Sequence, residues 1–560
     1  MNPVGSLDAA VLIAGGGPCG LMLANELGRR GVPTILVDEK LGTSPNPQAN
    51  ATQARTMEHY RRLGFADEIR GLGMSADYPT DVAYFTRYAK HELARIELPA
   101  AGDARRMIKQ LSGDWSAAEL PHRCSQMFIE PVLYKHASKL SSVSLRHGVR
   151  LTGFTDRGDH VEVSAARVAD DSPFVLRVAW LVGCDGPRSL VRRQLGISYV
   201  GEAGVQRDFM GGRMHMLHFR APHLYEIIPR GKAWMYWAFN CERRSFMCSI
   251  DGRGEFVFHT QIKAGDEDVE VSDARAHAML EQAIGAPCPV EILGRSAWTA
   301  GFALVAERFQ RGRVLLAGDA AHLFTPSGGL GYNTGIEDAG NLGWKLAAVA
   351  NQWGGLGLTD SYESERQPVA RRNTAFARGF AATIGVAPDP EIEDESPAGE
   401  LARQRAGAYL NAAVRAEFNI PGITFGARYD GSPIIVGDGT SPPPDAANSY
   451  TPTACPGGRA PHLWLADGGS IYDKLGFEFT LLRLGPKPAP ALGLMQAAKR
   501  LGMPLTSLDL ESSDLRDLYG ADLVLIRPDQ IVAWRGAQSP EDPVGLLGAS
   551  VGFSPSELRI

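Results

Sequence analysis

The feature that most limits how this chain can fold lies in its first 40 residues. An apolar run from Ala9 to Ala14 is followed by "GGGPCG", by "LMLANELGRRG" with helical spacing, and by the second apolar run "PTILVDEK". The order of strand, Gly-rich turn, helix, strand and acid predicts a βαβ dinucleotide-binding unit. We therefore expect an α/β protein with a Rossmann-like domain at its N-terminus.

Each glycine of this turn has a distinct physical task. Gly15 permits the tight turn, Gly17 lets a pyrophosphate approach the backbone, and Gly20 lets the helix pack on the strand. Glu39 follows the glycines by about 20 residues, accepts ribose hydroxyls and repels a 2′-phosphate. The site thus suits FAD or NAD rather than NADP. We interpret Cys19 as a small residue that fills the turn.

Two later segments predict further ligand contacts. "WLVGCDGPRSLVRRQLGI" ends a strand at Asp185-Gly186 and then starts a helix. "LLAGDAAHLFTPSGGLGYNTGIEDAGNLGWKL" ends a strand at Gly318-Asp319, where a carboxylate can accept from ribityl or ribose hydroxyls. Its Gly-rich loop points backbone N–H groups, and the positive end of a helix beginning near Asn333, toward a ligand.

A flavin needs such a positive turn, because its reduction places negative charge on the N1–C2=O edge of the ring. Gly328, Gly329 and Gly331 would leave space beside the ring.

Length and charge restrict the class of protein. A chain of 560 residues exceeds one ordinary domain. The net charge of −6, without a basic cluster, argues against nucleic acid and anionic membranes as partners. The seven cysteines are scattered without metal-ligand spacing, and we find neither a signal peptide nor a spanning segment. We expect a soluble cytoplasmic protein with a small-molecule substrate and no metal.

The motifs together resemble those of the single-component FAD-dependent aromatic hydroxylases, of the p-hydroxybenzoate hydroxylase and phenol hydroxylase type. The matching motifs are GGGPCG with Glu39, the CDG motif, the GD motif and the P-x-x-G-x-G-x-N run from Pro326 to Asn333. The resemblance implies that Asp319 binds the ribityl chain, that Pro326 lies at the reactive side of the ring, and that Asn333 with the following amides binds the pyrimidine edge. It also puts Arg55 and Gln126 along the FAD, and it implies that His322 of "GDAAH" is scaffold near the FAD rather than a base in the reaction.

The complete predicted FAD set is Gly15, Gly17, Pro18, Cys19, Gly20, Glu39, Lys40, Gln48, Arg55, Gln126, Asp185, Gly186, Gly318, Asp319, Pro326, Gly329, Gly331, Tyr332 and Asn333.

The resemblance also implies a domain plan. A discontinuous FAD-binding domain of the GR2 type would comprise residues 1–77, 104–186 and 296–400, with a β-sheet substrate domain inserted at 78–103 and 187–295. Residues 401–440 would form a helix and linker. Residues 441–560 are similar to the thioredoxin-like tail of the longer family members and follow a Pro/Gly-rich stretch. Without paired cysteines, this tail is interpreted as structural, with a homodimer surface as one expectation.

The implied reaction cycle uses NADPH or NADH, FAD and O2. The nicotinamide reduces FAD, O2 adds to give a C4a-hydroperoxide, and an electron-rich aromatic ring attacks its distal oxygen. A phenolate reacts faster than a phenol, so a base near the substrate hydroxyl should help. The sequence contains no second dinucleotide unit, which fits a nicotinamide that binds transiently.

The substrate pocket is expected from two strands, at 230–240 and 244–252. In the first, Trp234 and Tyr236 share one face, while Met235, Trp237 and Phe239 share the other. We predict that Tyr236 can bond a phenol. The predicted catalytic residues are Asn50, Tyr236, Pro326 and Gly331.

Two positions depart from the family pattern. Asn50 stands where phenol hydroxylases carry an acid, so it can orient a hydroxyl but cannot take its proton. Gln48 stands where many members carry an Arg that tracks flavin movement.

The sequence leaves alternatives open. A Baeyer–Villiger oxygenase acting on an aromatic polyketide shares all of these motifs. A flavin-holding redox sensor, with the C-terminal unit as its interaction surface, is the non-enzymatic alternative. The identity of the aromatic substrate, the position hydroxylated and the choice between NADPH and NADH also stay open.

Overall fold

The first layer of the protein is an eight-stranded sheet built around the predicted N-terminal unit. The computed structural model describes residues 7–203, 209–263, 271–384 and 386–559. The sheet has the order β18-β19-β10-β1-β2-β7, with β9 pairing β10 and β8 pairing β9. Its strands are β1 (Ala9–Ala14), β2 (Thr34–Asp38), β7 (Val143–His147), β8 (Val149–Asp156), β9 (Val161–Arg167), β10 (Pro173–Gly183), β18 (Gln310–Arg311) and β19 (Val314–Leu316). The expected Rossmann-like fold is confirmed, because β1, β2, β7, β10 and β19 run parallel.

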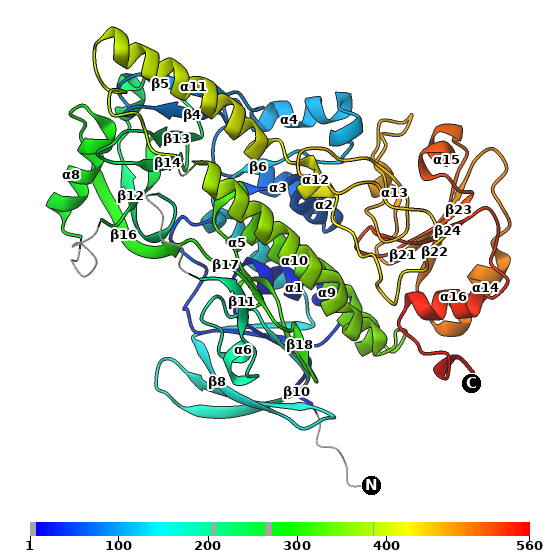
Figure 1. The fold of residues 1–560 in the computed structure, drawn as a ribbon. Coiled ribbons are helices and arrows are strands. Elements are labelled where there is room, and N and C mark those ends of the chain that lie inside the picture. The colour runs from blue at the N-terminus through cyan, green and yellow to red at the C-terminus, as the bar shows by residue number, and fades with distance from the viewer. Residues whose placement is uncertain (1–6, 204–208, 264–270, 385, 560) are drawn as a thin grey trace.

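Helices cover this sheet, whose central strand β1 is apolar throughout. Five of the six residues of β1 are buried, as expected for a parallel strand that is covered on both faces. Helix α1 (Pro18–Gly28) packs against α5 (Gln126–Ala137) and α9 (Leu330–Ala350). The long helix α10 (Gly357–Ile384) lies beside α9 (Figure 1). Helix α9 follows β19 in the chain and contacts the turn at residues 318–320, directly after this strand.

A second, seven-stranded sheet has the order β16-β12-β15-β14-β13-β4-β5. Its strands are β4 (Val82–Phe85), β5 (Glu92–Ile96), β12 (Gly212–Arg220), β13 (Met235–Ala238), β14 (Ser245–Ser249), β15 (Glu255–Gln261) and β16 (Glu291–Ala300). Helix α8 (Asp273–Ile284) packs on one face of it. The boundary predicted between residues 295 and 296 falls inside β16, since this strand continues until Ala300 pairs with Gly212.

Helix α11 (Pro397–Phe418) joins this second sheet to the rest of the chain. It packs against β5 and also contacts the loop that precedes α9. The boundary predicted between residues 400 and 401 therefore falls inside a helix, which starts at Pro397 after the capping residue Ser396.

The C-terminal unit is a mixed sheet of four strands in the order β22-β21-β23-β24, and it agrees with the predicted thioredoxin-like fold. The strands are β21 (Phe479–Leu484), β22 (Leu505–Leu510), β23 (Leu523–Ile526) and β24 (Val532–Gly536), with helices α14 (Leu492–Leu501), α15 (Ser513–Tyr519) and α16 (Pro543–Ser550). Figure 1 shows this unit at the side of the molecule away from β12 and β16. No helix in the described ranges is both long and apolar enough to cross a bilayer.

Shorter elements connect these layers. They are β3 (Ala51–Thr52), α2 (Ala54–Arg62), α3 (Ala66–Arg70), α4 (Ala101–Met107), β6 (His122–Arg123), α6 (Leu190–Gln194), β11 (Tyr199–Glu202), α7 (Leu224–Ile227), β17 (Ala303–Ala306), β20 (His322–Leu323), α12 (Pro421–Phe425) and α13 (Ile471–Lys474). Strand β3 pairs with β6, which brings the loop around residue 50 next to the start of α5.

Candidate functional site

The glycines of the first turn hold the backbone geometry of a phosphate-binding loop. Gly15 has φ of +111°, and a Cβ there would lie 2.2 Å from the carbonyl oxygen of Cys184. A Cβ on Gly20 would lie 2.0 Å from the carbonyl oxygen of Gly15. At Gly17 nothing lies within 4 Å of such a Cβ, and no side chain caps the N-terminus of α1. The first amides of α1 are therefore free to bind an anion.

An acid that the sequence analysis missed fixes this loop. Asp38 Oδ2 accepts a hydrogen bond from the Gly16 N–H at 2.6 Å, and its Oδ1 accepts from the Lys40 N–H at 2.8 Å. The predicted acid, Glu39, is exposed just beyond β2, as is Lys40. Two adjacent acids at the end of a strand cannot be told apart by spacing, because one residue decides which face a side chain takes.

Cys19 packs within the turn. Its Sγ lies 3.9 Å from that of Cys184. The hydrogen bond to Cys184 and burial hold the pKa of the Cys19 thiol well above its usual value. The thiol is thus neutral, as a packing role requires.

The GD motif presents one exposed carboxylate. Asp319 is exposed, whereas its neighbours Gly318 and Ala320 are buried. The Gly318 N–H donates to Asp338 Oδ2 at 3.1 Å, and the backbone carbonyl of Asp319 accepts from the Tyr199 hydroxyl. The backbone of the motif is therefore fixed while the Asp319 carboxylate stays free for ligand hydroxyls.

Behind this motif lies a buried charge cluster. Asp338 accepts from His322 Nε2 at 2.6 Å and from Arg366 Nε at 2.8 Å. Although burial opposes them, these two partners hold the pKa of the Asp338 carboxyl below its usual value. His322 is fully buried and supports Asp338, which agrees with a scaffold role.

The Gly-rich loop before α9 turns earlier than predicted. Gly328 and Gly329 have φ of +72° and +63°, and α9 begins at Leu330 rather than near Asn333. These left-handed residues reverse the chain at little cost only because they are glycines. No side chain caps this helix, so its first amides face whatever lies in front of it.

Asn333 ties two loops together. Its Oδ1 accepts from the Gln53 N–H at 2.7 Å, and its Nδ2 donates to the carbonyl of Ala51 at 2.9 Å. Gln53 Nε2 also donates to the carbonyl of Gly328 at 2.8 Å. Both ends of the Asn333 side chain are thus engaged, and the backbone amides of this turn are the free donors.

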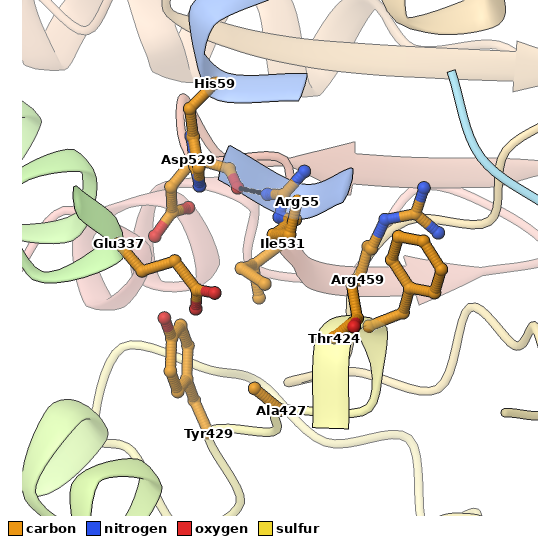
Figure 2. A pocket seen from close by; sticks show the side chains of 10 residues that line it. Arg55, His59, Glu337, Thr424, Ala427, Tyr429, Arg459, Asp529 and Ile531 are labelled. Carbon is orange, nitrogen blue, oxygen red and sulfur yellow. Dashed lines mark hydrogen bonds between the residues drawn. The ribbon is translucent and has the colours of Figure 1, made fainter. Parts of the chain in front are cut away.

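Arg55, predicted to lie along FAD, reaches the C-terminal unit instead. Its Nη2 donates to the carbonyl of Asp529 at 2.6 Å, and its Nη1 donates to Glu58 Oε2 at 2.9 Å. Arg55 lines a small cavity of about 20 Å³ together with Glu337 and Arg459. Figure 2 shows these side chains around it. The predicted FAD contact of Arg55 therefore has no support in the structure.

The other predicted contacts lie around the same two loops. Gln126 starts α5, its N–H donates to the carbonyl of Ala49, and its side chain donates to Glu130. Asp185 Oδ2 accepts from two amides of α6, while its Oδ1 is buried without a partner. Pro18 and Gly331 lie in the first turns of α1 and α9, and Gly186 has φ of +75°. Gln48 and Pro326 are exposed. The hydroxyl of Tyr332 forms a hydrogen bond with that of Tyr60.

Unpartnered polar atoms mark the side of the site that faces the second sheet. Asn50 Oδ1, the Tyr84 hydroxyl, Trp237 Nε1 and Glu417 Oε2 are buried without hydrogen-bond partners. The Tyr84 and Trp237 rings stack with centroids 5.4 Å apart. Each buried polar atom without a partner costs about 1–3 kcal/mol. Such a group of unmet atoms is the expected lining of a ligand site.

The two faces of β13 differ from the prediction. Tyr236 is fully buried in the core against α8, and its hydroxyl accepts from the Ala233 N–H at 2.6 Å. The structure therefore places it away from the site, without support for a bond to substrate. Trp234 packs in the same core as Trp237, because it precedes the first paired residue of β13 and strict alternation does not yet apply.

Family models match most of the chain. The FAD binding domain model matches residues 8–377, and the model described as aromatic-ring hydroxylase, C-terminal, matches residues 453–550. The first range contains the glycine turn, the GD motif and the Gly-rich loop. The second covers most of the C-terminal sheet.

Full-length relatives agree with these models. An FAD-dependent monooxygenase of Penicillium oxalicum is 33% identical, over 87% of this chain and 95% of its own. A putative polyketide hydroxylase of Streptomyces halstedii is 31% identical, over 94% of this chain and 93% of its own. The solved structure of the rebeccamycin biosynthetic enzyme RebC with reduced flavin is 32% identical, covers 98% of this chain and 99% of its own, and superposes with a TM-score of 0.87.

Proposed function

Because the chain belongs to the FAD-dependent aromatic-ring hydroxylases, we propose that it uses NAD(P)H and O2 to add a hydroxyl group to a phenolic compound. One observation carries the proposal. The free amides at the start of α9 directly follow Gly328 in the chain. The Gly328 N–H donates to Glu417, which lies beside the aromatic rings and the unpartnered polar atoms. A flavin ring and an aromatic substrate would therefore be neighbours.

The residues of this chain fit FAD. The open space at Gly17 and the uncapped start of α1 suit the pyrophosphate, and the free carboxylate of Asp319 suits the ribityl hydroxyls. The amides of the first turn of α9, from Leu330 to Asn333, suit the edge of the ring that gains charge. When bound, FAD accepts a hydride from NAD(P)H and delivers one oxygen atom of O2 to the aromatic ring.

The core beside this loop suits a planar substrate. Tyr84 and Trp237 offer stacked rings and two free polar atoms, and Asn50 offers a carbonyl oxygen that can orient a substrate hydroxyl. Burial of these groups keeps water from the reacting atoms, which limits the wasteful release of peroxide. Asn50 cannot take a proton, so the hydroxyl needs another base.

The nicotinamide cofactor is expected to bind without a domain of its own, because the sequence contains one βαβ dinucleotide unit. Since no nicotinamide domain reveals a preference, the choice between NADPH and NADH is a matter for the assay described below. Because NAD(P)H is an intracellular reductant, we propose a cytoplasmic location.

A single assay tests the proposal. Purified protein loaded with FAD would be supplied with NADPH or NADH, and oxygen uptake and peroxide would be measured with phenols, phenylpropanoids and polycyclic phenols. The expected result is that one class accelerates NAD(P)H oxidation and consumes oxygen with little peroxide. Stimulation by a cyclic ketone or quinone alone would replace hydroxylation with Baeyer–Villiger oxygenation, and no stimulation by any compound would favour a redox sensor.

A further inference from the structure

One buried carboxylate next to the Gly-rich loop has a free oxygen. Glu417, in the last turn of α11, is only 4% exposed. Its Oε1 accepts from the Gly328 N–H at 2.9 Å, and its Oε2 is buried without a hydrogen-bond partner. A carboxylate used only to hold the loop would need one oxygen, and an amide would serve that purpose equally well. The second oxygen therefore points to a ligand.

A cation faces this carboxylate but does not neutralise it. Arg123, in β6, acts on Glu417 electrostatically, yet within the described residues no carboxylate lies at ion-pair distance from its guanidinium. The guanidinium instead lies over the ring of Trp234 at 4.4 Å and that of Phe418 at 5.7 Å. Burial lowers the pKa of Arg123 to about 10, so the group is still charged at neutral pH. An anion formed between Arg123 and Glu417 would be stabilised by this charge.

Tyr84 completes the surroundings. Glu417 and Tyr84 interact electrostatically, and Arg244 acts on Tyr84 from the segment before β14. The Tyr84 hydroxyl and Trp237 Nε1 have no partners either, and the two rings stack. A planar aromatic compound with a hydroxyl group would satisfy these atoms and the free oxygen of Glu417 together.

We propose that Glu417 is the catalytic base that takes the proton from the hydroxyl group of the aromatic substrate, and that Arg123 faces the phenolate oxygen that results. This inference rests on the proposed function, since it assigns a residue to the same reaction. In the step, the O–H bond of the substrate breaks, the proton passes to Oε2 of Glu417, and the electron pair stays on the phenolate oxygen. The negative charge thus moves from the carboxylate to the substrate, where it enriches the ring that accepts oxygen.

The titration of Glu417 supports this assignment. Burial raises the pKa of the carboxyl to about 7, although the Gly328 N–H and Arg123 oppose the shift. A base works best when its pKa lies near the working pH, because it is then both ionised and able to hold the proton. The groups that act on it come from three different segments: Gly328 before α9, Arg123 in β6 and Tyr84 in β4.

The decisive variant is Glu417→Gln, because the amide oxygen can still accept from the Gly328 N–H while it cannot take a proton. Hydroxylation of phenol and 1-naphthol by the FAD-loaded protein should fall about 100-fold, the lower range for loss of a general base. The wild type should lose activity as the pH falls through about 7, and the variant should lack this limb. The matched control is Glu400→Gln, which removes a carboxylate exposed at the other end of α11 and should leave rate and profile unchanged.

A binding measurement tests the same assignment without turnover. Pentafluorophenol is ionised at neutral pH, so its anion should bind the wild type only when Glu417 carries a proton. Its affinity should fall about tenfold for each pH unit above the titration of Glu417, whereas Glu417→Gln should bind it with constant affinity. Quenching of flavin fluorescence measures this binding.

The outcomes separate the two proposals. If Glu417→Gln matches the wild type in both profiles while the wild type hydroxylates phenols, or if pentafluorophenolate does not bind the wild type, the assignment of Glu417 is wrong. If pentafluorophenolate binds with the expected pH dependence but no phenol is hydroxylated, the proposed function fails and the placement of Glu417 beside a bound phenol stands.

Discussion

Three glycines in the first turn are glycines for different reasons. At Gly15 and Gly20 a Cβ would run into the backbone of the protein itself, at 2.2 Å and 2.0 Å. At Gly17 a Cβ would meet no protein atom within 4 Å, and the backbone has φ of −76°, which any residue adopts. The space at Gly17 is therefore reserved for something other than protein.

This difference predicts opposite effects of the same substitution. Gly17→Ala should leave thermal unfolding of the FAD-free protein unchanged but weaken FAD binding at least tenfold, because the methyl group enters the space of the pyrophosphate. Gly15→Ala should destabilise the FAD-free protein by more than about 2 kcal/mol, because φ of +111° is strained for alanine and the methyl group clashes with Cys184. Calorimetry without FAD, followed by FAD titration, measures both. Equal loss of stability in the two variants would contradict the assignment.

Substitutions of the neighbouring acids Asp38 and Glu39 should likewise have different effects on stability and on FAD binding. Asp38→Asn should lower the free energy of unfolding by about 1–3 kcal/mol, because an NH2 group would replace one of the two acceptors that hold the Gly16 and Lys40 amides. Glu39→Gln should leave stability unchanged, since the side chain is exposed, and should weaken FAD binding only. The FAD-free protein is again the reference for urea denaturation. A stability loss in Glu39→Gln would show that it, too, holds the loop.

At the scale of elements, the two faces of β13 have different roles, one in the core and one at the ligand site. Tyr236 lies in the core formed with α8, and Trp237 stacks on Tyr84 in the core that contains the unpartnered polar atoms. One strand therefore contributes to stability on one face and to ligand contacts on the other, as alternation along a strand allows.

Substitutions on the two faces should separate these tasks. Tyr236→Phe should lower the free energy of unfolding by about 1 kcal/mol, because the Ala233 N–H loses its acceptor, and should leave the KM for the aromatic substrate unchanged. Trp237→Phe should raise this KM several-fold, because the free Nε1–H is lost and the smaller ring stacks less on Tyr84, with little effect on FAD binding. Steady-state kinetics measures the KM of each variant, and urea denaturation of the same samples measures its free energy of unfolding. A higher KM in Tyr236→Phe would place that hydroxyl at the substrate after all.

The elements that could be predicted from the sequence are those whose signals are local. The glycine turn, the GD motif and the Gly-rich loop each lie within a few residues of a strand end, so spacing alone locates them. Glu417 gave no such signal, because it reaches the Gly-rich loop from a helix almost 90 positions later in the chain. The motif around Arg55 predicts a contact with FAD, yet the partners of Arg55, Asp529 and Gln530, belong to the C-terminal unit. Such contacts depend on how segments distant in the chain pack together, and hydrophobic periodicity along the sequence does not predict this packing.

At the scale of the whole molecule, buried ion pairs fasten the C-terminal unit to the FAD-binding domain. Glu58 of α2 accepts from Arg459 at 2.5 Å and from Arg55 at 2.9 Å. Glu365 of α10 binds Lys345 of α9 and Arg527 of the C-terminal unit, each at 2.7 Å. Because α9 also presents the Gly-rich loop, displacement of the C-terminal unit should disturb the ring site. Removing one partner from a buried pair leaves an uncompensated charge and costs about 3–5 kcal/mol.

Glu58 makes this contact sensitive to acid. Although burial opposes them, Arg459 and Arg55 lower the pKa of Glu58 from an ordinary 4.5 to about 2. Between these values the unfolded chain binds a proton that the folded protein does not. The stabilisation, about 3 kcal/mol for this shift, is therefore complete above the ordinary pKa and is lost as the pH falls toward that of the folded state.

The difference in stability between a Glu58→Gln variant and the wild type should therefore depend on pH. At neutral pH the variant should be less stable by about 3–5 kcal/mol, because Arg459 and Arg55 lose their counter-charge. As the pH falls below 4.5 this gap should narrow, because the wild type then loses the same interaction by protonation. Urea denaturation followed by tryptophan fluorescence and FAD release, from pH 7 to pH 3, measures the gap. The control Asp67→Asn removes an exposed pair with Arg105 and should show no gap at any pH. A gap for Glu58→Gln that stays constant into acid would mean that the carboxylate contributes through packing rather than charge.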